Sequence, residues 1–405
     1  MDGEAIIGQL MTTGGRADPY PLYARAHELG AAAPAGPGTV LAIGHTAADQ
    51  VLRSPAFVME DIEDRLRADP RLARHTSVTL FGRSMLQRNA PDHARVRSLV
   101  ASAFNARRVA ALRPAVEAAV GRLLDRLAEQ GADGSPVDFM DDFAFRLPVE
   151  VICELLGVPP RDHYRFRTLA GDLAVALELV QDLDELGAAD VAADELTGYF
   201  TGLVAERLAR PQDDLVSDLA RIAADAPERI SGAELLANLV LLLVAGFETT
   251  TNLLGNGLAL AFRHPEVAAG LRTGAVDPAA FTEEVLRFDS PVQLTTRIAA
   301  ADGLDVAGVP APAGTMVLVL LGAANHDPTR YRRPELFDPA RPDIQPLSFG
   351  GGAHFCLGSR LARTEAEVAF PALLDRFPRL APGGVATRRD RLVLRGYETL
   401  PVTVR

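Results

Sequence analysis

The stretch that decides the fold of this 405-residue chain is Ser348-Phe349-Gly350-Gly351-Gly352-Ala353-His354-Phe355-Cys356-Leu357-Gly358. Three consecutive glycines carry no Cβ atoms, so their backbone can turn tightly and approach a flat partner closely. From Gly358 to Phe370 the apolar residues follow at helical spacing. We therefore expect Cys356 at a helix N-terminus, where unpaired N–H groups and the helix dipole favour the thiolate over the thiol.

A thiolate in that position serves as a nucleophile or as a metal ligand. A cysteine nucleophile needs a base, and His354 is the nearby candidate. A zinc site needs several Cys and His ligands, but the only other cysteine is Cys153, which we expect in the core because it lies in an apolar helical pattern. A haem iron needs only one axial protein ligand, and thiolate is one of those found.

The spacing Phe349-Gly350-x-Gly352-x-His354-x-Cys356-x-Gly358 resembles, position for position, the haem-binding loop of the cytochromes P-450. These are haem-thiolate monooxygenases. The resemblance implies that Cys356 is the metal ligand, that the cofactor is heme b (iron protoporphyrin IX), and that the chain has the cytochrome P-450 fold, with a long central helix over the haem and small β-sheets.

Composition sets the class of protein and its general partners. Hydrophobic residues make up 48% of the chain and charged residues 23%, as is ordinary for a soluble globular protein. The net charge of −12 argues against nucleic acid or an anionic membrane as a general partner. We see no signal peptide at the start of the chain, and the apolar run Leu239–Gly246 is shorter than the ~20 residues that span a bilayer. A cytoplasmic monomer is therefore expected.

Periodicity predicts a mainly α (α-rich α+β) protein folded as a single domain, 1–405. We expect the helical part at about 90–290 and 357–378, and the β-rich part mainly at about 1–60 and 295–320 plus 385–405. Ser231-Gly-Ala-Glu234 is a capping box that opens a long helix to about Arg263. Other expectations are a solvated surface at 60–75, a loop at 76–92, and strands at 304–310 and 392–394. Two helices are expected over 162–187 and 188–209, with an acidic turn at 181–185 between them.

The middle of the long helix reads Ala245-Gly246-Phe247-Glu248-Thr249-Thr250. Small side chains at 245 and 246 share a helix face with Thr249 and leave a shallow depression for a plate and a small ligand. Close helix–helix packing would use the same small residues. The segment resembles the family's oxygen-activation motif, which implies catalytic roles for Thr249, as the hydroxyl beside dioxygen, and for Glu248, as the acidic member of a proton relay.

Two acid–base patterns resemble a further structural feature of the family. Glu284 and Arg287 are three residues apart on an expected helix, and Arg341 ends the stretch Pro334-Glu-Leu-Phe-Asp-Pro-Ala-Arg. An exposed pair of this kind contributes only ~0.2–0.5 kcal/mol. The resemblance instead implies a buried triad that fixes the cysteine loop and takes no part in catalysis.

Cations suited to two propionate carboxylates form the next group. His93 and Arg97 lie four residues apart on one helix face, Arg297 lies in an expected strand, and His354 lies in the cysteine loop. Arginine binds carboxylate bidentately. The cofactor-binding set implied by the resemblance is His93, Arg97, Ala245, Gly246, Thr249, Arg297, Phe349, Gly350, His354, Cys356 and Gly358.

The implied reaction is RH + O₂ + two electrons + two protons giving ROH + H₂O. No G-x-G-x-x-G follows an expected strand, so electrons should come from a separate ferredoxin and ferredoxin reductase. A basic face for the ferredoxin is expected at Arg95, Arg107, Arg108, Arg113, Arg360 and Arg363. A lipophilic substrate such as a polyketide, macrolide or terpenoid suits the mostly apolar candidate lining, which comprises Thr79, Leu80, Phe81, Leu173, Leu177, Val180, Leu294 and Thr295.

Other outcomes stay open from the sequence. The same haem-thiolate site could catalyse epoxidation, oxidative coupling or peroxide-driven oxidation, although enzymes of the peroxide type usually lack the pair Glu248 and Thr249. A haem-binding sensor or carrier without turnover is a different class, and a helical protein without haem is the simplest alternative.

Overall fold

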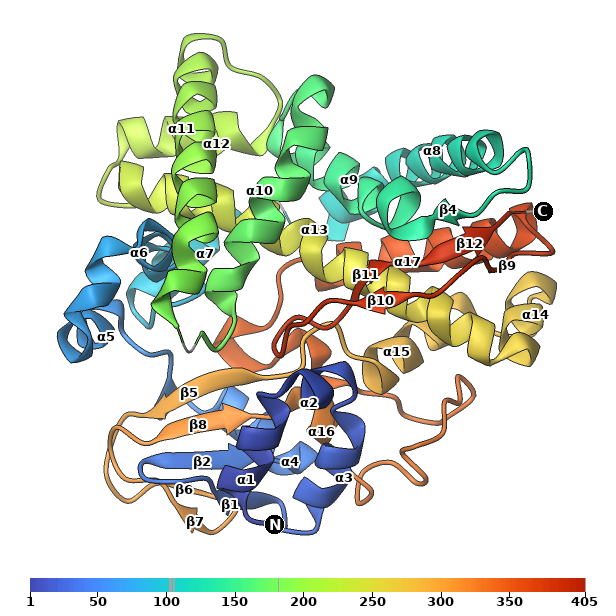
Figure 1. Ribbon diagram of the computed structural model, residues 1–405. Helices are drawn as coiled ribbons and strands as arrows, with labels where there is room; N and C mark the ends of the chain where they lie inside the picture. Colours follow the sequence, from blue (N-terminus) through green and yellow to red (C-terminus); the bar gives the residue numbers. More distant parts are fainter. Residues whose placement is uncertain (102–103, 105, 181, 405) are drawn as a thin grey trace. The chain divides into compact units, whose positions relative to one another are not determined.

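The computed structural model describes residues 1–404 apart from 102–103, 105 and 181. It is mainly helical with small sheets (Figure 1), which confirms the predicted fold class. The chain folds into two compact units, and we describe each by itself. Unit 1 comprises Met1–Val58, Glu117–Ala144 and Thr249–Arg405, and unit 2 comprises Met59–Val116 and Phe145–Glu248. That residues 1–405 form a single domain remains a prediction.

A five-stranded sheet organises part of unit 1. Its strand order is β1 (Ala32–Pro34), β2 (Thr39–Ala42), β8 (Met316–Val319), β5 (Thr295–Ala299) and β3 (Phe57–Val58). Strands β2 and β8 are parallel, and the other neighbours are antiparallel. Buried β-branched residues of β2 and β8 pack with α4 (His45–Arg53) and α16 (Leu321–Ala324) in one apolar cluster, so this sheet is held by side-chain burial as well as by its ladder.

The remaining elements of unit 1 are short strands and helices. The smaller sheets pair β6 (Asp305–Val306) with β7 (Val309–Pro310), β10 (Thr387–Arg388) with β11 (Tyr397–Thr399), and β12 (Pro401–Thr403) with both β4 (Val137–Asp138) and β9 (Ala381–Pro382). The helices are α1 (Gly3–Leu10), α2 (Thr13–Ala17), α3 (Tyr20–His27), the π-helical η3 (Met140–Ala144), α14 (Pro265–Thr273), α15 (Pro278–Phe288), the single turns η7 (Leu347–Phe349) and η8 (Gly352–His354), and α17 (Ser359–Arg376).

The long helix α13 runs from Gly232 to Arg263, as predicted. Its capping box is formed, because Ser231 N donates to Glu234 Oε2 at 2.9 Å and Glu234 N donates to Ser231 Oγ at 3.2 Å. The helix is long and apolar enough to cross a membrane by length and composition, yet 61% of its most apolar window is buried inside the protein, as is typical of a core helix. At Gly257 it lies so close to α17 that a Cβ atom would come within 2.2 Å of Phe370 Cζ.

Unit 2 is helical throughout its described part. Its elements are α5 (Ile62–Ala68), η1 (Pro70–Arg74), α6 (Thr76–Arg83), α7 (Asp92–Ala101), the first half of α8 (Ala106–Gln130), α9 (Arg146–Leu156), η4 (Pro160–Arg165), α10 (Phe166–Leu173), η5 (Ala174–Leu177), η6 (Leu183–Leu186), α11 (Gly187–Ala209), α12 (Leu215–Asp225) and the first half of α13.

The predicted loop at 76–92 is wrong over its first half, which forms helix α6. The local sequence lacks a clean helical period, so tertiary contacts stabilise this helix. The Asp190 carboxylate, from α11, accepts hydrogen bonds from the backbone N of Ser77 at 3.0 Å and from its hydroxyl at 2.6 Å. Gly82 lies against Ile62 of α5, where a Cβ atom would come within 2.4 Å of the Ile62 side chain.

Four other segments differ from the prediction. The helix expected over 162–187 is divided into η4, α10, η5 and η6 within the described residues. In the expected acidic turn at 181–185, of which residue 181 lies outside the described residues, the Asp182 side chain accepts from Asp184 N, a local bond that competes with helix continuation. The strand at 304–310 is a hairpin that turns at Gly308, with φ +86°. Residues 392–394 contribute only a bridge between Leu394 and Val292. The surface at 60–75 contains α5 and η1, of which Ile62 and Leu72 are buried.

Candidate functional site

The cysteine loop of unit 1 is a pair of tight turns that lead into α17. Cys356 N donates to the Phe349 carbonyl oxygen at 3.0 Å, which closes the loop, and α17 begins three residues after the cysteine. Cys356 and Phe355 are both exposed. The Arg363 guanidinium lies 4.5 Å from the centre of the Phe349 ring, so the first turn of α17 also contacts the start of the loop.

Two glycines of this loop are required by its geometry. Gly350 has φ +70° and Gly352 has φ +64°, values that favour glycine. A Cβ atom on Gly352 would lie 2.4 Å from the Leu52 carbonyl oxygen and 2.8 Å from Arg53 Cα, so this residue packs directly on the backbone of α4. The glycine run therefore serves two purposes, an unusual turn and a close approach to a neighbouring helix.

Ser348 and Asn325 anchor the loop, and the sequence analysis missed both. The Ser348 hydroxyl donates to the Leu286 carbonyl oxygen at 2.6 Å and accepts from Ser290 Oγ at 2.7 Å and Asn325 Nδ2 at 2.9 Å. Asn325 Oδ1 in turn accepts from Leu347 N at 2.7 Å. Their long sequence separation leaves no periodic signal; the position of Asn325 at the end of an apolar run was the only hint in the sequence.

The predicted triad is formed in unit 1. Arg287 donates to Glu284 through Nε and Nη2, both at 2.7 Å, and both side chains are 0% exposed. Arg341 Nε lies 3.6 Å from Glu284 Oε1, and Asp338 N donates to the same oxygen at 2.8 Å. Arg287 Nη1 also donates to the Asn325 carbonyl oxygen at 3.0 Å. The triad is thus connected to the cysteine loop through Asn325.

Arg297 is the cation of unit 1 that most clearly requires an anion. It lies in β5, is 4% exposed, and donates to the Thr296 carbonyl oxygen at 2.7 Å. Burial lowers the pKa of its guanidinium to about 10, and no described residue forms an ion pair with it. A buried charge without a counter-charge is unfavourable, so this residue suits an anionic group of a ligand.

Two further predicted cations belong to unit 2. His93 and Arg97 lie one turn apart on α7, with His93 4% exposed and Arg97 partly buried. Between them, Arg95 is bound to Glu234 at 2.6 Å and to Asp92 at 3.0 Å. Because these carboxylates fix Arg95 to the start of α13, they orient the helix that carries His93 and Arg97.

The middle of α13 has an accessible stripe within a buried helix. Ala245 is exposed and Gly246 and Thr249 are partly exposed, whereas Glu248 is 2% exposed. Thr249 belongs to unit 1 and the other three to unit 2. On another side of the helix, a Cβ atom on Gly246 would lie 2.7 Å from Ile152 Cγ1 of α9. The small residues of this segment therefore serve two purposes: Gly246 allows close packing against α9, and the segment also has an accessible face of small side chains.

The candidate substrate-lining residues differ in burial. Leu80, Phe81, Leu173 and Leu294 are buried, at 9%, 1%, 0% and 2% exposure. Val180 packs against the apolar cluster around Ile62 and Leu72. Thr79, Leu177 and Thr295 are partly exposed. The buried residues act first as core, which leaves the partly exposed ones as the accessible members of the set.

These side chains fit a haem with one thiolate ligand. Within unit 1, an exposed thiol follows a glycine backbone, and Arg297 is a buried cation that lacks a carboxylate. Within the described part of the chain, no three His, Cys, Asp or Glu side chains gather as a metal site. His354, at the end of η8, is partly buried.

Comparison with known proteins gives consistent matches. The family model described as Cytochrome P450 matches residues 279–393. A putative cytochrome P450 140 of Mycobacterium tuberculosis is 38% identical over 395 residues, which is 96% of this chain and 89% of that protein. The 6-deoxyerythronolide B hydroxylase of Saccharopolyspora erythraea is 40% identical over 329 residues, 80% of this chain and 78% of the hydroxylase. The ligand-free structure of Mycobacterium smegmatis CYP164A2 superposes with a TM-score of 0.87 at 36% identity, covering 99% of this chain and all of that one.

Replacing Ser348 should loosen the cysteine loop. Ser348→Ala leaves two buried donors and one acceptor without their partner, and we expect a loss of about 1–3 kcal/mol in the free energy of unfolding. Hydrogen exchange of the Gly350 and Cys356 amides should accelerate. The control is Ser98→Ala, whose exposed hydroxyl bonds only to the Arg95 carbonyl oxygen. Equal exchange rates in the two variants would contradict this anchoring role.

Replacing Arg297 should have opposite effects on the protein with and without cofactor. Arg297→Gln removes an uncompensated buried charge, so the apoprotein should be as stable as the parent or more stable. The same change removes a cation for the cofactor's carboxylates, so haem should dissociate about tenfold faster. Thermal unfolding of the apoprotein and haem transfer to an acceptor protein measure the two effects. A less stable apoprotein with unchanged haem dissociation would contradict the assignment.

Proposed function

The chain belongs to the cytochrome P450 family and is a haem-thiolate monooxygenase, and from this premise we propose that it hydroxylates a lipophilic small molecule in secondary-metabolite biosynthesis, of the polyketide, macrolide or terpenoid kind. The observation that carries the proposal is the cysteine loop, closed between Phe349 and Cys356 and anchored through Asn325. The similarity of the chain to the 6-deoxyerythronolide B hydroxylase supports the substrate class.

Each predicted site residue has a role in this proposal. The Cys356 thiolate would bind the haem iron, and Ala245, Gly246, Phe349, Gly350 and Gly358 would leave room for the macrocycle. His93, Arg97, Arg297 and His354 bind the two propionates. The bound haem supplies the oxidation chemistry. The Thr249 hydroxyl holds a proton at Oγ1, and the buried Glu248 carboxylate accepts and returns protons from inside α13.

The proposed partners follow from the absence of a reductase motif in the sequence. Electrons come from a ferredoxin and its reductase, and the protein works as a cytoplasmic monomer without a membrane. Of the arginines proposed for docking, Arg95 and Arg363 are bound to Glu234 and Glu283, and Arg108 lies 3.5 Å from Asp218. The exposed Arg360 forms no ion pair with a described residue, so it is available for docking.

The ligand assignment is tested by the absorption spectrum of the reduced protein with carbon monoxide. We expect a strongly red-shifted Soret band, which indicates thiolate-ligated iron. Cys356→Ala should lose that band, while Cys153→Ala, which removes the other thiol from the core, should keep it. An ordinary Soret position in the parent protein, or no haem band after expression with haem, would overturn the assignment. Substrate-dependent electron uptake then separates an enzyme from a sensor or carrier.

Thr249 is tested by the coupling of electron uptake to product. Thr249→Ala should retain haem but release about tenfold more peroxide per product, because the hydroxyl that controls proton delivery is lost. Thr249→Ser keeps a hydroxyl at the same position and should restore most of the coupling. Coupling that is the same in the Ala and Ser variants would refute this role. Products other than an alcohol would favour the epoxidation or coupling alternatives.

A further inference from the structure

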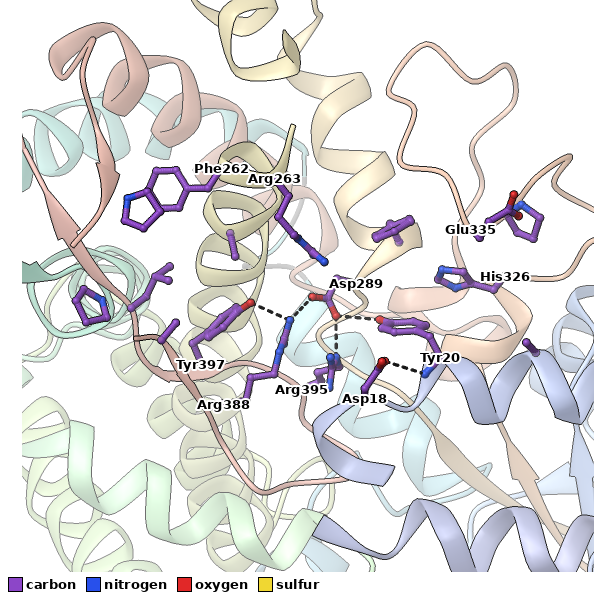
Figure 2. Close-up of a pocket in the computed structure, with 18 of the residues that line it drawn as sticks. Asp18, Tyr20, Phe262, Arg263, Asp289, His326, Glu335, Arg388, Arg395 and Tyr397 are labelled. Carbon is purple, nitrogen blue, oxygen red and sulfur yellow. Dashed lines mark hydrogen bonds and ion pairs between the residues drawn. The ribbon is translucent and has the colours of Figure 1, made fainter. Parts of the chain in front are cut away.

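Unit 1 contains a cavity that the cysteine loop does not line. Its volume is about 740 Å³, within the ~300–1,000 Å³ that small-molecule pockets usually have. Figure 2 shows its polar residues meeting around Asp289. The walls come from α3, the C-terminal ends of α13 and α15, and the segments around β9 to β12. No residue between 347 and 358 is among its lining residues.

The floor of this cavity is a rigid network with fixed charges. Asp289 is 1% exposed and accepts from Arg388 Nη2 at 2.7 Å, Arg395 Nε at 2.8 Å and the Tyr20 hydroxyl at 2.9 Å. Burial alone would raise the pKa of Asp289, but Arg388 and Arg395 hold it well below its usual range. One carboxylate thus faces two guanidiniums, so the floor carries a net positive charge. The Arg388 guanidinium also lies 4.1 Å from the centre of the Tyr397 ring.

A third guanidinium faces the cavity from its wall. Arg263 is the last residue of α13 and lines the pocket, and Figure 2 shows its side chain directed into it. No described residue forms an ion pair or a side-chain hydrogen bond with Arg263. Arg263 is itself exposed, as are the acidic lining residues Asp18 and Glu335, so solvent screens all three charges. The net positive charge of the inner part of the cavity therefore comes from Arg388 and Arg395, which outnumber Asp289.

The remaining lining is apolar and aromatic. Phe262 and Phe288 are partly buried, and Ala259 and Leu400 are 8% and 4% exposed. His326 lies between Tyr20 and Phe288 with tilted rings, whose centres are 4.7 Å and 5.5 Å away. Burial and the nearby Arg287 lower the pKa of His326 to about 3, so His326 is uncharged at neutral pH.

We propose that this cavity is a binding site for small organic carboxylates with an aromatic or bulky aliphatic body. The carboxylate of the ligand binds the guanidinium of Arg263 and also faces the positively charged floor at Arg388. The body of the ligand packs against Phe262 and Phe288. Charge-assisted pairing fixes the anionic end, and apolar burial supplies the rest of the affinity. The site goes beyond the proposed monooxygenase function and does not depend on it.

One edge of the cavity lies at the protein surface. Gly384 and Ala386 line the cavity, and Val385 between them is 85% exposed. A bulky residue at position 386 should therefore obstruct the mouth.

The test is calorimetric titration of the haem-loaded protein with 2-naphthoate, after 4-phenylimidazole has occupied the iron. We expect one 2-naphthoate per chain, and about tenfold weaker binding of the neutral analogue 2-naphthamide. Arg263→Gln and Ala386→Trp should each weaken 2-naphthoate binding about tenfold. Arg25→Gln is the matched control, since Arg25 is exposed on α3 and does not line the cavity.

Three outcomes would overturn the proposal. The first is no saturable binding of 2-naphthoate up to about 5 mM. The second is equal affinity for 2-naphthamide, which would show that the site does not recognise the carboxylate. The third is Arg263→Gln binding as tightly as Arg25→Gln, which places the probe elsewhere. Because no turnover is measured, a failure here is independent of the monooxygenase assignment.

Discussion

The buried ion pair of Glu284 and Arg287 is the interaction on which the cysteine loop depends. Two charges taken out of water are tolerated only when each is paired and fully hydrogen-bonded. Here the Glu284 carboxylate also accepts from Asp338 N, and the Arg287 guanidinium donates to three carbonyl groups, those of Asn325, Pro334 and Leu336. Removing either partner would leave the other charged and buried, so this pair fixes several chain segments at once.

Asn325 carries this rigidity to the loop. Its backbone carbonyl accepts from Arg287, and its side chain bonds to Leu347 N and Ser348 Oγ. The position of the thiol is thus set by residues that never touch it. Such indirect support is common around reactive groups, whose own surroundings must stay open to a ligand.

The sequence was sufficient for elements whose stability is local, and insufficient for the rest. The start of α13 could be predicted because Ser231 and Glu234 cap it within one turn. Helix α6 could not, because its stability comes from Ile62 and from the Asp190 carboxylate, which lies far along the chain. The same distinction holds at the site: the resemblance of local motifs to a known family predicted Cys356 and the triad, whereas Ser348 and Asn325 act through hydrogen bonds between distant residues. The burial of Arg297 is likewise a property of the assembled sheet, which a single strand does not reveal.

The packing of Gly352 on the backbone of α4 has a consequence for how the protein is made. Residues 52 and 352 are in contact, and strand β2 near the start of the chain pairs with β8 near its end. Contacts between such distant segments form slowly, and a chain emerging from the ribosome lacks its last third until synthesis is almost finished. The loop that holds the thiol can therefore be completed only after translation of α17, so cofactor capture is a late step, and the early helices must stay soluble until then.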